Sequence, residues 1–255
     1  MTSGYSLSLA GKNAVISGSS RGVGFAIASA LAAAGANVAI NYLSNEERGV
    51  TALAALREIN PSAISVKADV SAEEGAHALV SEAENAFGGV DILVNNAHGR
   101  IVRNMFPRSA WKEHQDHIDS ILRPAFYLSR RVTDGMKSRG WGRIVNIGNN
   151  MLLQPIKGYS ALTSAMGSLF GFTRNLAAEA GPWGITVNMV SPGFVLTEEA
   201  PYTNESVLQA IRESTPLGRL AQPQDVAGAA VFFCSDLGRF VTGANISVDG
   251  GRVMG

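Results

Sequence analysis

A glycine-rich turn between a strand-like run and a helix-like run constrains this chain more than any other feature. Residues 14–16 are apolar, the turn contains Gly18, Gly22 and Gly24, and a helical pattern follows over residues 25–34. Glycines let the backbone approach a ligand, and a helix start offers N–H groups and a positive dipole end. The turn is either an ordinary connection or a diphosphate cradle, and its strand–turn–helix context favours the cradle. We therefore predict a dinucleotide-binding loop made of Gly18, Ser20, Arg21, Gly22, Val23 and Gly24.

Composition and charge predict one α/β domain over residues 1–255 and exclude several classes of partner. Hydrophobic residues make up 46% of the chain, charged residues 16%, and the formal net charge is zero. This balance gives no electrostatic surface for nucleic acid. No apolar run is long enough to span a bilayer, and residues 1–5 do not resemble a signal peptide. The single cysteine, Cys234, lies in an apolar run, which predicts a buried packing residue and favours a cytoplasmic location.

Strand-like and helix-like runs alternate along the chain. The strand-like runs after the first cover residues 38–42, 63–70, 90–94, 142–147, 185–190 and 245–251. This alternation predicts a single-domain, Rossmann-like, doubly wound parallel sheet with helices on both faces. In such sheets the ligand binds at the carboxyl ends of the strands. The most irregular segment, about 193–222, is predicted to be a substrate lid.

The glycine spacing also resembles a known family. Gly18-x-x-x-Gly22-x-Gly24 resembles the loop of short-chain dehydrogenases/reductases, with Ser17 in place of the usual threonine. Further stretches resembling that family are Asp69-Val70, Asn95-Asn96-Ala97, Pro192-Gly193, Pro216-Leu217-Gly218-Arg219 and Val248-Asp249-Gly250-Gly251. The resemblance covers essentially the whole chain and includes the 3-oxoacyl- and enoyl-carrier-protein reductases. It implies that Asp69 and Val70 lie against an adenine, and that Asn96 and Val195 contribute to the cofactor site.

The residues near the expected adenosine ribose favour NADPH over NADH. An acidic residue at the end of the second strand of dinucleotide folds binds the ribose 2′-hydroxyl and repels a 2′-phosphate. This chain has Asn41 there and no acidic residue before Glu46. Arg21, within the glycine loop, offers a cation to a 2′-phosphate, although it is also an ordinary choice for a solvated loop residue.

The resemblance places four catalytic positions, which the family fills with Asn, Ser, Tyr and Lys. Counting back from Gly184 puts the Tyr position at Leu162 and the Lys position at Met166. The Ser position falls at Asn149 and the Asn position at Ile121. All four are therefore expected to be replaced. Leucine and methionine cannot exchange protons, and their spacing of four predicts an apolar pair on one helical face.

Tyr159 is a candidate to replace the family's proton-donating tyrosine. Tyr159 lies seven residues before Met166, and this spacing resembles the Tyr-to-Lys spacing of short-chain-type enoyl-carrier-protein reductases. Tyr159 is interpreted either as a proton donor that steadies an enolate oxygen or as a loop or core tyrosine. Asn149 is a candidate for bonding the substrate oxygen, with His98 and Lys157 as weaker candidates. No His, Cys or carboxylate spacing predicts a metal site.

Taken together, these features predict an atypical NADPH-dependent short-chain reductase. Its substrate is expected to be a small carbonyl compound or a carbonyl-conjugated double bond, such as an enone, enoyl or quinone-like compound. The alternatives are a non-redox enzyme (an isomerase, lyase or cyclase) and a non-catalytic subunit that uses the cofactor fold as a scaffold. The family resemblance also implies a homo-oligomer, a tetramer or a dimer, formed through the helices near 111–137 and 162–180.

Overall fold

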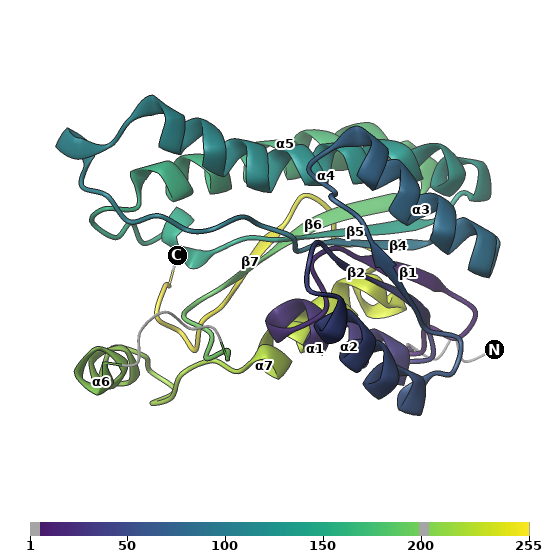
Figure 1. Ribbon diagram of the computed structural model, residues 1–255, viewed down its shortest axis with the longest axis horizontal. Coiled ribbons are helices and arrows are strands. Elements are labelled where there is room, and N and C mark those ends of the chain that lie inside the picture. The colour runs from purple at the N-terminus through teal and green to yellow at the C-terminus, as the bar shows by residue number, and fades with distance from the viewer. Residues whose placement is uncertain (1–5, 199–203, 255) are drawn as a thin grey trace.

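The fold is built around a single parallel β-sheet. The computed structural model describes residues 6–198 and 204–254. These residues form a seven-stranded sheet in the order β3-β2-β1-β4-β5-β6-β7, with every neighbouring pair parallel (Figure 1). The strands are β1 (Asn13–Ile16), β2 (Asn37–Tyr42), β3 (Ile64–Lys67), β4 (Ile92–Asn95), β5 (Gly142–Ile147), β6 (Ile185–Pro192) and β7 (Asn245–Val248). The strand order reverses between β1 and β4, which confirms the predicted doubly wound, Rossmann-like α/β fold.

Helices cover both faces of this sheet. The helices of the described residues are α1 (Gly22–Ala33), α2 (Glu46–Ile59), α3 (Glu73–Phe87), α4 (Trp111–Arg139), α5 (Ser160–Ala180), α6 (Glu205–Glu213) and α7 (Pro223–Cys234), of which α6 lies away from the sheet (Figure 1). Helices α1, α2 and α7 lie on one face, and α3, α4 and α5 lie on the other (Figure 1). A buried apolar cluster fills the space beneath each layer. Cys234 is fully buried at the end of α7, as predicted.

The predicted lid segment contains a helix that the sequence analysis did not identify. Helix α6 lies within 193–222, and its first turn is capped by Asn204, whose Oδ1 accepts a hydrogen bond from the Ser206 amide at 3.0 Å. Its apolar residues Val207, Leu208 and Ile211 recur at helical spacing, but only Leu208 is buried. The two ends of the segment meet, because the Leu196 amide donates to the Ala221 carbonyl at 2.9 Å. Residues 199–203 of the predicted lid lie outside the described residues.

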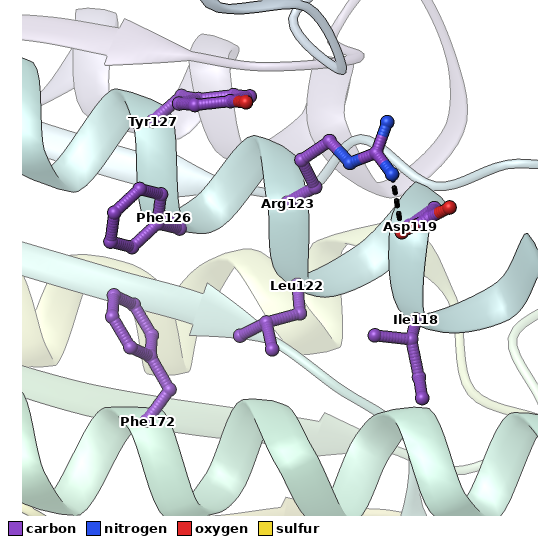
Figure 2. A pocket seen from close by; sticks show the side chains of 7 residues that line it. All are labelled: Ile118, Asp119, Leu122, Arg123, Phe126, Tyr127 and Phe172. Atoms are coloured by element: carbon purple, nitrogen blue, oxygen red, sulfur yellow. Dashed lines mark ion pairs between the residues drawn. The ribbon is translucent and has the colours of Figure 1, made fainter. Parts of the chain in front are cut away.

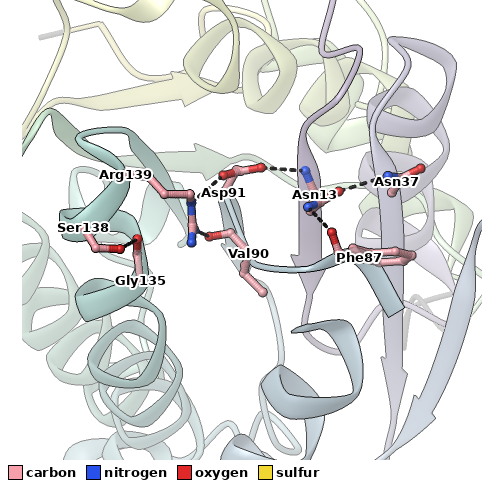
Figure 3. Close-up of polar contacts among 8 residues, drawn as sticks. All are labelled: Asn13, Asn37, Phe87, Val90, Asp91, Gly135, Ser138 and Arg139. Carbon is pink, nitrogen blue, oxygen red and sulfur yellow. Dashed lines mark hydrogen bonds and ion pairs between the residues drawn. The ribbon is translucent and has the colours of Figure 1, made fainter. Parts of the chain in front are cut away.

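Polar side chains tie the strands together at the amino edge of the sheet, opposite the glycine loop. Asp91 accepts hydrogen bonds from the Asn13 amide and from Nε of Arg139, both at 3.1 Å (Figure 3). The side chain of Asn13 in turn accepts from Nδ2 of Asn37 at 3.0 Å. These contacts join the starts of β1, β2 and β4 to the end of α4. They fix the register of the strands whose opposite ends carry the candidate site.

Candidate active site

The glycine loop packs against the end of β4 so closely that only glycine fits. A Cβ on Gly18 would lie 2.8 Å from Cα of Ala97. A Cβ on Gly24 would lie 2.5 Å from Nδ2 of Asn96 and 2.6 Å from the Gly18 carbonyl oxygen. Gly18 and Gly22 also have positive φ angles of 60° and 54°, which side chains rarely adopt. This geometry leaves bare backbone at the start of α1, where the strand order reverses, and it fits a dinucleotide diphosphate.

Hydrogen bonds formed by Ser17 and Asn96 hold the glycine loop against the end of β4. The Ser17 hydroxyl oxygen accepts hydrogen bonds from the amides of Asn96 and Ala97, both at 3.0 Å. Nδ2 of Asn96 donates to the carbonyl oxygens of Ser17 at 3.1 Å and Gly18 at 2.8 Å. Asn96 was predicted to bind the cofactor, and the contacts formed by its side chain give it a further role in shaping the loop.

Asn41 has a different place from the one that the sequence analysis assumed. Its side chain is 2% exposed and points into the protein instead of toward a ribose. Oδ1 accepts a hydrogen bond from the Gly18 amide at 3.1 Å, and Nδ2 donates to the Ala68 carbonyl at 3.0 Å. Asn41 therefore connects β1, β2 and the end of β3. With the Asn41 side chain buried, a preference for NADPH depends on the charged residues that surround the loop.

Two arginines lie at the outer side of the glycine loop. Arg21 precedes the first turn of α1, and Arg48 lies in the first turn of α2. Burial and then repulsion from Arg48 lower the pKa of Arg21, whereas the nearby Glu198 raises it. Because an arginine stays protonated in proteins, two cations and the Glu198 carboxylate lie on this side of the loop.

The first residues after β6 also approach this loop. A Cβ on Gly22 would lie 3.5 Å from Cγ2 of Thr197, so the start of the predicted lid lies against the glycine loop. Val195, a predicted cofactor contact, forms an isolated parallel bridge with Ala221. The arrangement holds the base of the lid beside the candidate cofactor site.

The predicted adenine contacts differ in their exposure. Asp69 is exposed, and its Oδ1 accepts hydrogen bonds from the Ser71 amide at 3.0 Å and the Ser71 hydroxyl at 2.6 Å. Val70 is 6% exposed and belongs to the apolar cluster beneath α3 and α4. Asp69 thus shapes the turn into α3, and Val70 packs against the sheet.

Three of the four positions predicted to replace the family's catalytic residues come together in one apolar cluster, and Asn149 lies outside it. Ile121 of α4 and Met166 of α5 are each 5% exposed, and Leu162 of α5 is fully buried. They pack with Ala125, Ala165, Leu169 and Met189. None of these side chains can donate or accept a proton. The cluster therefore provides shape and exclusion of water, and proton transfer requires another group.

Asn149 and Asn150 follow β5 and have different partners. Oδ1 of Asn149 accepts a hydrogen bond from the Met151 amide at 2.8 Å and caps a short 3-10 turn. Asn150 is 6% exposed, and its Nδ2 donates to Oδ2 of Asp249 at 3.1 Å. The Asp249 carboxylate also accepts from the Val253 amide at 3.1 Å. Sequence reasoning proposed Asn149 and missed the Asn150–Asp249 pair, because nothing in the local pattern joins residues so far apart.

Tyr159 lies at the start of α5, between the apolar cluster and an arginine. Its ring packs against that cluster, and the guanidinium carbon of Arg103 lies 5.8 Å from the ring centroid. Sequence reasoning did not single out Arg103. The weaker candidates have other surroundings: His98 is exposed with Nδ1 2.8 Å from the Gly99 carbonyl, and Lys157 is exposed.

The described residues contain neither a metal-binding cluster nor a membrane-spanning helix. No three His, Cys, Asp or Glu side chains within residues 6–198 and 204–254 gather closely enough to hold a metal ion. Across the same ranges, no helix combines the length and apolar content needed to cross a bilayer.

The sheet, the glycine loop and the reversal of strand order define a dinucleotide-binding enzyme of the Rossmann-like class. The chain belongs to the short-chain dehydrogenase/reductase family and is an oxidoreductase of that type. Residues 18–252 match the family model described as enoyl-(acyl carrier protein) reductase.

Relatives and a solved structure agree with this assignment. The chain is 34% identical to the 3-oxoacyl-(acyl-carrier-protein) reductase FabG of Aquifex aeolicus, over 96% of this chain and 98% of the relative. It is 35% identical to nodulation protein G of Azospirillum brasilense, over 94% and 97% of the two chains. A short-chain dehydrogenase/reductase from Serratia marcescens superimposes with a TM-score of 0.87 at 31% identity, covering 96% and 98% of the two chains.

Proposed function

We propose that this chain is an atypical NADPH-dependent reductase of a small carbonyl compound or of a double bond conjugated to a carbonyl group. The observation that carries this proposal is the close packing of Gly18 and Gly24 in a diphosphate-binding loop. When bound, NADPH supplies a hydride. The chain holds both reactants in position, and positioning alone lowers the barrier to reaction substantially.

The preference for NADPH rests on Arg21 and Arg48. Guanidinium groups bind phosphate through charge-assisted hydrogen bonds that match its geometry. Repulsion from Arg48 contributes to the lowered pKa of Arg21, which supports placing both cations beside the same anion. The stretch between Asn41 and Asn45 contains no carboxylate that would repel a 2′-phosphate. A ribose 2′-phosphate is therefore the anion that we assign to this arginine pair.

We assign proton donation to Tyr159 and contact with the substrate oxygen to Asn149. Met166 of the apolar cluster occupies the family's lysine position, so no lysine assists the tyrosine from there. A tyrosine without such help is a weak base at neutral pH but still donates a proton. A substrate whose reduction gives a stabilised enolate or phenolate places the lightest demand on such a donor. Enones, enoyl thioesters and quinones meet this condition.

Nucleotide binding followed by oxidation of the bound nucleotide tests the proposal. The purified protein is titrated with NADPH and with NADH while nicotinamide fluorescence is followed, and enones and quinones are then added to the complex. We expect tighter binding of NADPH and its oxidation by at least one member of the panel. Failure of both nucleotides to bind would contradict the cofactor assignment.

A second candidate function follows from the same apolar cluster. Full burial of Leu162 between α4 and α5 is also what a protein without redox chemistry would show. In that case the fold serves an isomerase, lyase or cyclase, or a non-catalytic subunit of an assembly. Tight NADPH binding without oxidation by any compound in the panel would favour this second candidate.

The outer faces of α4 and α5 support self-association. Ile118, Leu122, Phe126 and Phe172 line a hollow there, and the rings of Phe126 and Phe172 face each other at 6.4 Å (Figure 2). The side chain of Phe126 is 42% exposed. Large apolar side chains on a protein surface are favoured in contacts between proteins, so this exposure indicates an interface. We assign this face to the contact of a homodimer or homotetramer, and we place the protein in the cytoplasm.

A further inference from the structure

Arg103 is an exposed residue that the proposed mechanism does not use. It lies in the loop between β4 and α4, and its guanidinium carbon is 5.8 Å from the ring centroid of Tyr159. The loop before α5 carries Tyr159, so residues from two separate loops meet at the assigned proton donor. An arginine in this position adds a fixed positive charge to the place where the substrate oxygen is expected.

The described part of the chain supplies no carboxylate partner to this charge. Among residues 6–198 and 204–254, no carboxylate pairs with Arg103, and its only hydrogen bond runs from Nε to the Lys157 carbonyl at 3.4 Å. Arg100 in the same loop differs, because it lines a hollow together with Glu113 and Asp116. The two terminal nitrogens of Arg103 are left as donors in the planar arrangement that matches carboxylate and phosphate oxygens.

The backbone around Arg103 holds this contact in place. The Asn104 amide donates to the Gly158 carbonyl at 2.8 Å, which joins the loop after β4 to the loop before α5. Gly158 has a φ of +89°, and a Cβ there would lie 3.0 Å from Cγ of Arg103. Glycine is therefore needed at 158 both for its backbone angle and for the passage of the Arg103 side chain. The two loops bring the guanidinium to Tyr159 through fixed contacts.

The surrounding loop adds to the positive charge. Residues 98–108 contain Arg100, Arg103 and Arg108 and no acidic residue, and Lys157 is exposed on the adjoining loop. Charges of one sign at the mouth of a site attract ligands of the opposite sign. Arg103 is the member of this group that lies against Tyr159.

We propose that Arg103 binds an oxyanion of the substrate, a carboxylate or a phosphate carried by the same molecule whose carbonyl oxygen faces Tyr159. This inference rests on the proposed function, because Tyr159 marks the substrate site. It narrows the substrate class from carbonyl compounds in general to those that carry an acidic group. Arg103 then selects substrates that carry an anionic group. The number of bonds between that group and the carbonyl decides whether the carbonyl reaches Tyr159.

Matched pairs of ligands test this inference by binding, without any need for turnover. Pyruvate is compared with methyl pyruvate, and dihydroxyacetone phosphate with dihydroxyacetone, by calorimetric titration at millimolar concentrations. The first pair tests a carboxylate and the second a phosphate. We expect the anion of at least one pair to bind about tenfold or more tighter than its neutral partner, as a charge-assisted contact predicts. Equal binding within both pairs, or no binding of either anion, would overturn the inference.

Three variants test whether Arg103 itself causes the preference for the anion. Arg103→Gln is expected to abolish the preference for the anion, and Arg103→Lys to retain part of it because the charge remains. Arg108→Gln removes the same charge from the same loop away from Tyr159, so it is expected to keep the preference. An equal loss in Arg103→Gln and Arg108→Gln would show a diffuse electrostatic effect and would overturn the specific role of Arg103.

The nucleotide titration separates this inference from the proposed function. Binding of NADPH is expected to be unchanged in Arg103→Gln, which also shows that the variant is folded. If the unaltered protein binds no nucleotide and still selects the anion through Arg103, the proposed reductase function fails and the anion site stands. If NADPH binds and the anion preference is absent, the reductase function stands and the anion site fails.

Discussion

The side chain of Asn41 accepts a hydrogen bond from the amide of Gly18 at 3.1 Å and so connects the second strand to the glycine loop. The same side chain donates to the Ala68 carbonyl at 3.0 Å, and it is almost fully buried. One amide therefore satisfies backbone groups from two other parts of the sheet. The shape of the loop depends on a residue that a nucleotide is not expected to touch.

Replacement of Asn41 tests this dependence. Asn41→Ala leaves the Gly18 amide and the Ala68 carbonyl without this partner, and we expect a loss of about 1–3 kcal/mol in the free energy of unfolding. Nucleotide binding is expected to weaken as well. Urea denaturation measures the first effect and fluorescence titration the second. Asn175→Ala, at an exposed side chain that bonds the Gly171 carbonyl, is the control and is expected to change stability by less than about 0.5 kcal/mol. Similar losses in both variants would contradict the bracing role.

The role of Gly18 in the cofactor loop is predictable from the sequence, whereas the role of Asn41 is not. Strand, turn and helix are adjacent in the chain, and the requirement for glycine is a local property of the backbone. The partners of Asn41 come from β1 and β3, and only the folded sheet brings them together. A polar residue in a strand gives no sign of which distant carbonyl it contacts.

The same physical limit applies to the substrate side of the site. Arg103 meets Tyr159 because the Asn104 amide joins the loop after β4 to the Gly158 carbonyl, a contact between residues distant in the sequence. Helix α6 was missed for a different reason. Its apolar residues do recur at helical spacing, but the helix is only nine residues long and lies in a segment interrupted by proline and glycine. Buried strands such as β1 and β4, by contrast, are recognisable in the sequence by continuous apolar runs.

Charge reversal at Arg21 and Arg48 tests the preference for NADPH. Arg21→Glu and Arg48→Glu replace a cation by an anion beside the expected 2′-phosphate, and each is expected to weaken NADPH binding about tenfold or more. NADH lacks that phosphate, so its binding serves as the internal control and is expected to change less. Fluorescence titration at two salt concentrations gives both values. An equal loss of NADPH and NADH binding would contradict the assignment of these arginines to the 2′-phosphate.

Tyr159→Phe tests the proposed proton donor. Removal of the hydroxyl is expected to slow turnover about a hundredfold or more, in line with the usual contribution of general acid catalysis. Binding of NADPH is expected to be unchanged, because the ring still packs against the apolar cluster. Stopped-flow oxidation of bound NADPH by a responsive enone or quinone gives the rate. Tyr127→Phe, on the outer face of α4, is the matched control, and equal rates in the two variants would remove Tyr159 from the mechanism.

The buried thiol of Cys234 gives a prediction about pH. Burial raises the pKa of Cys234 from 9.0 to about 12, an effect that nearby Arg143 only partly offsets. The thiolate fraction near pH 8 is therefore about a thousandfold lower in the folded protein than in the unfolded chain. Reaction with a thiol reagent is expected to be slow in buffer and fast in urea. The folded state prefers the neutral thiol, so this contribution to stability is fully present below pH 9 and is lost as the pH rises toward 12. Rapid labelling of the native protein at pH 8 would contradict this burial.

The assignment of the α4–α5 face to self-association predicts the effect of a charge at its centre. Phe126→Asp places a carboxylate opposite Phe172 in the hollow of Figure 2, where its burial by a second copy would require costly desolvation. We expect a smaller particle in light scattering, while a folded protomer remains because Phe126 is already 42% exposed. Phe106→Asp introduces the same charge at a side chain that is 73% exposed in the loop before α4, and it is expected to leave the mass unchanged. An unchanged mass in Phe126→Asp, with circular dichroism showing an intact fold, would exclude this face as the main contact between copies.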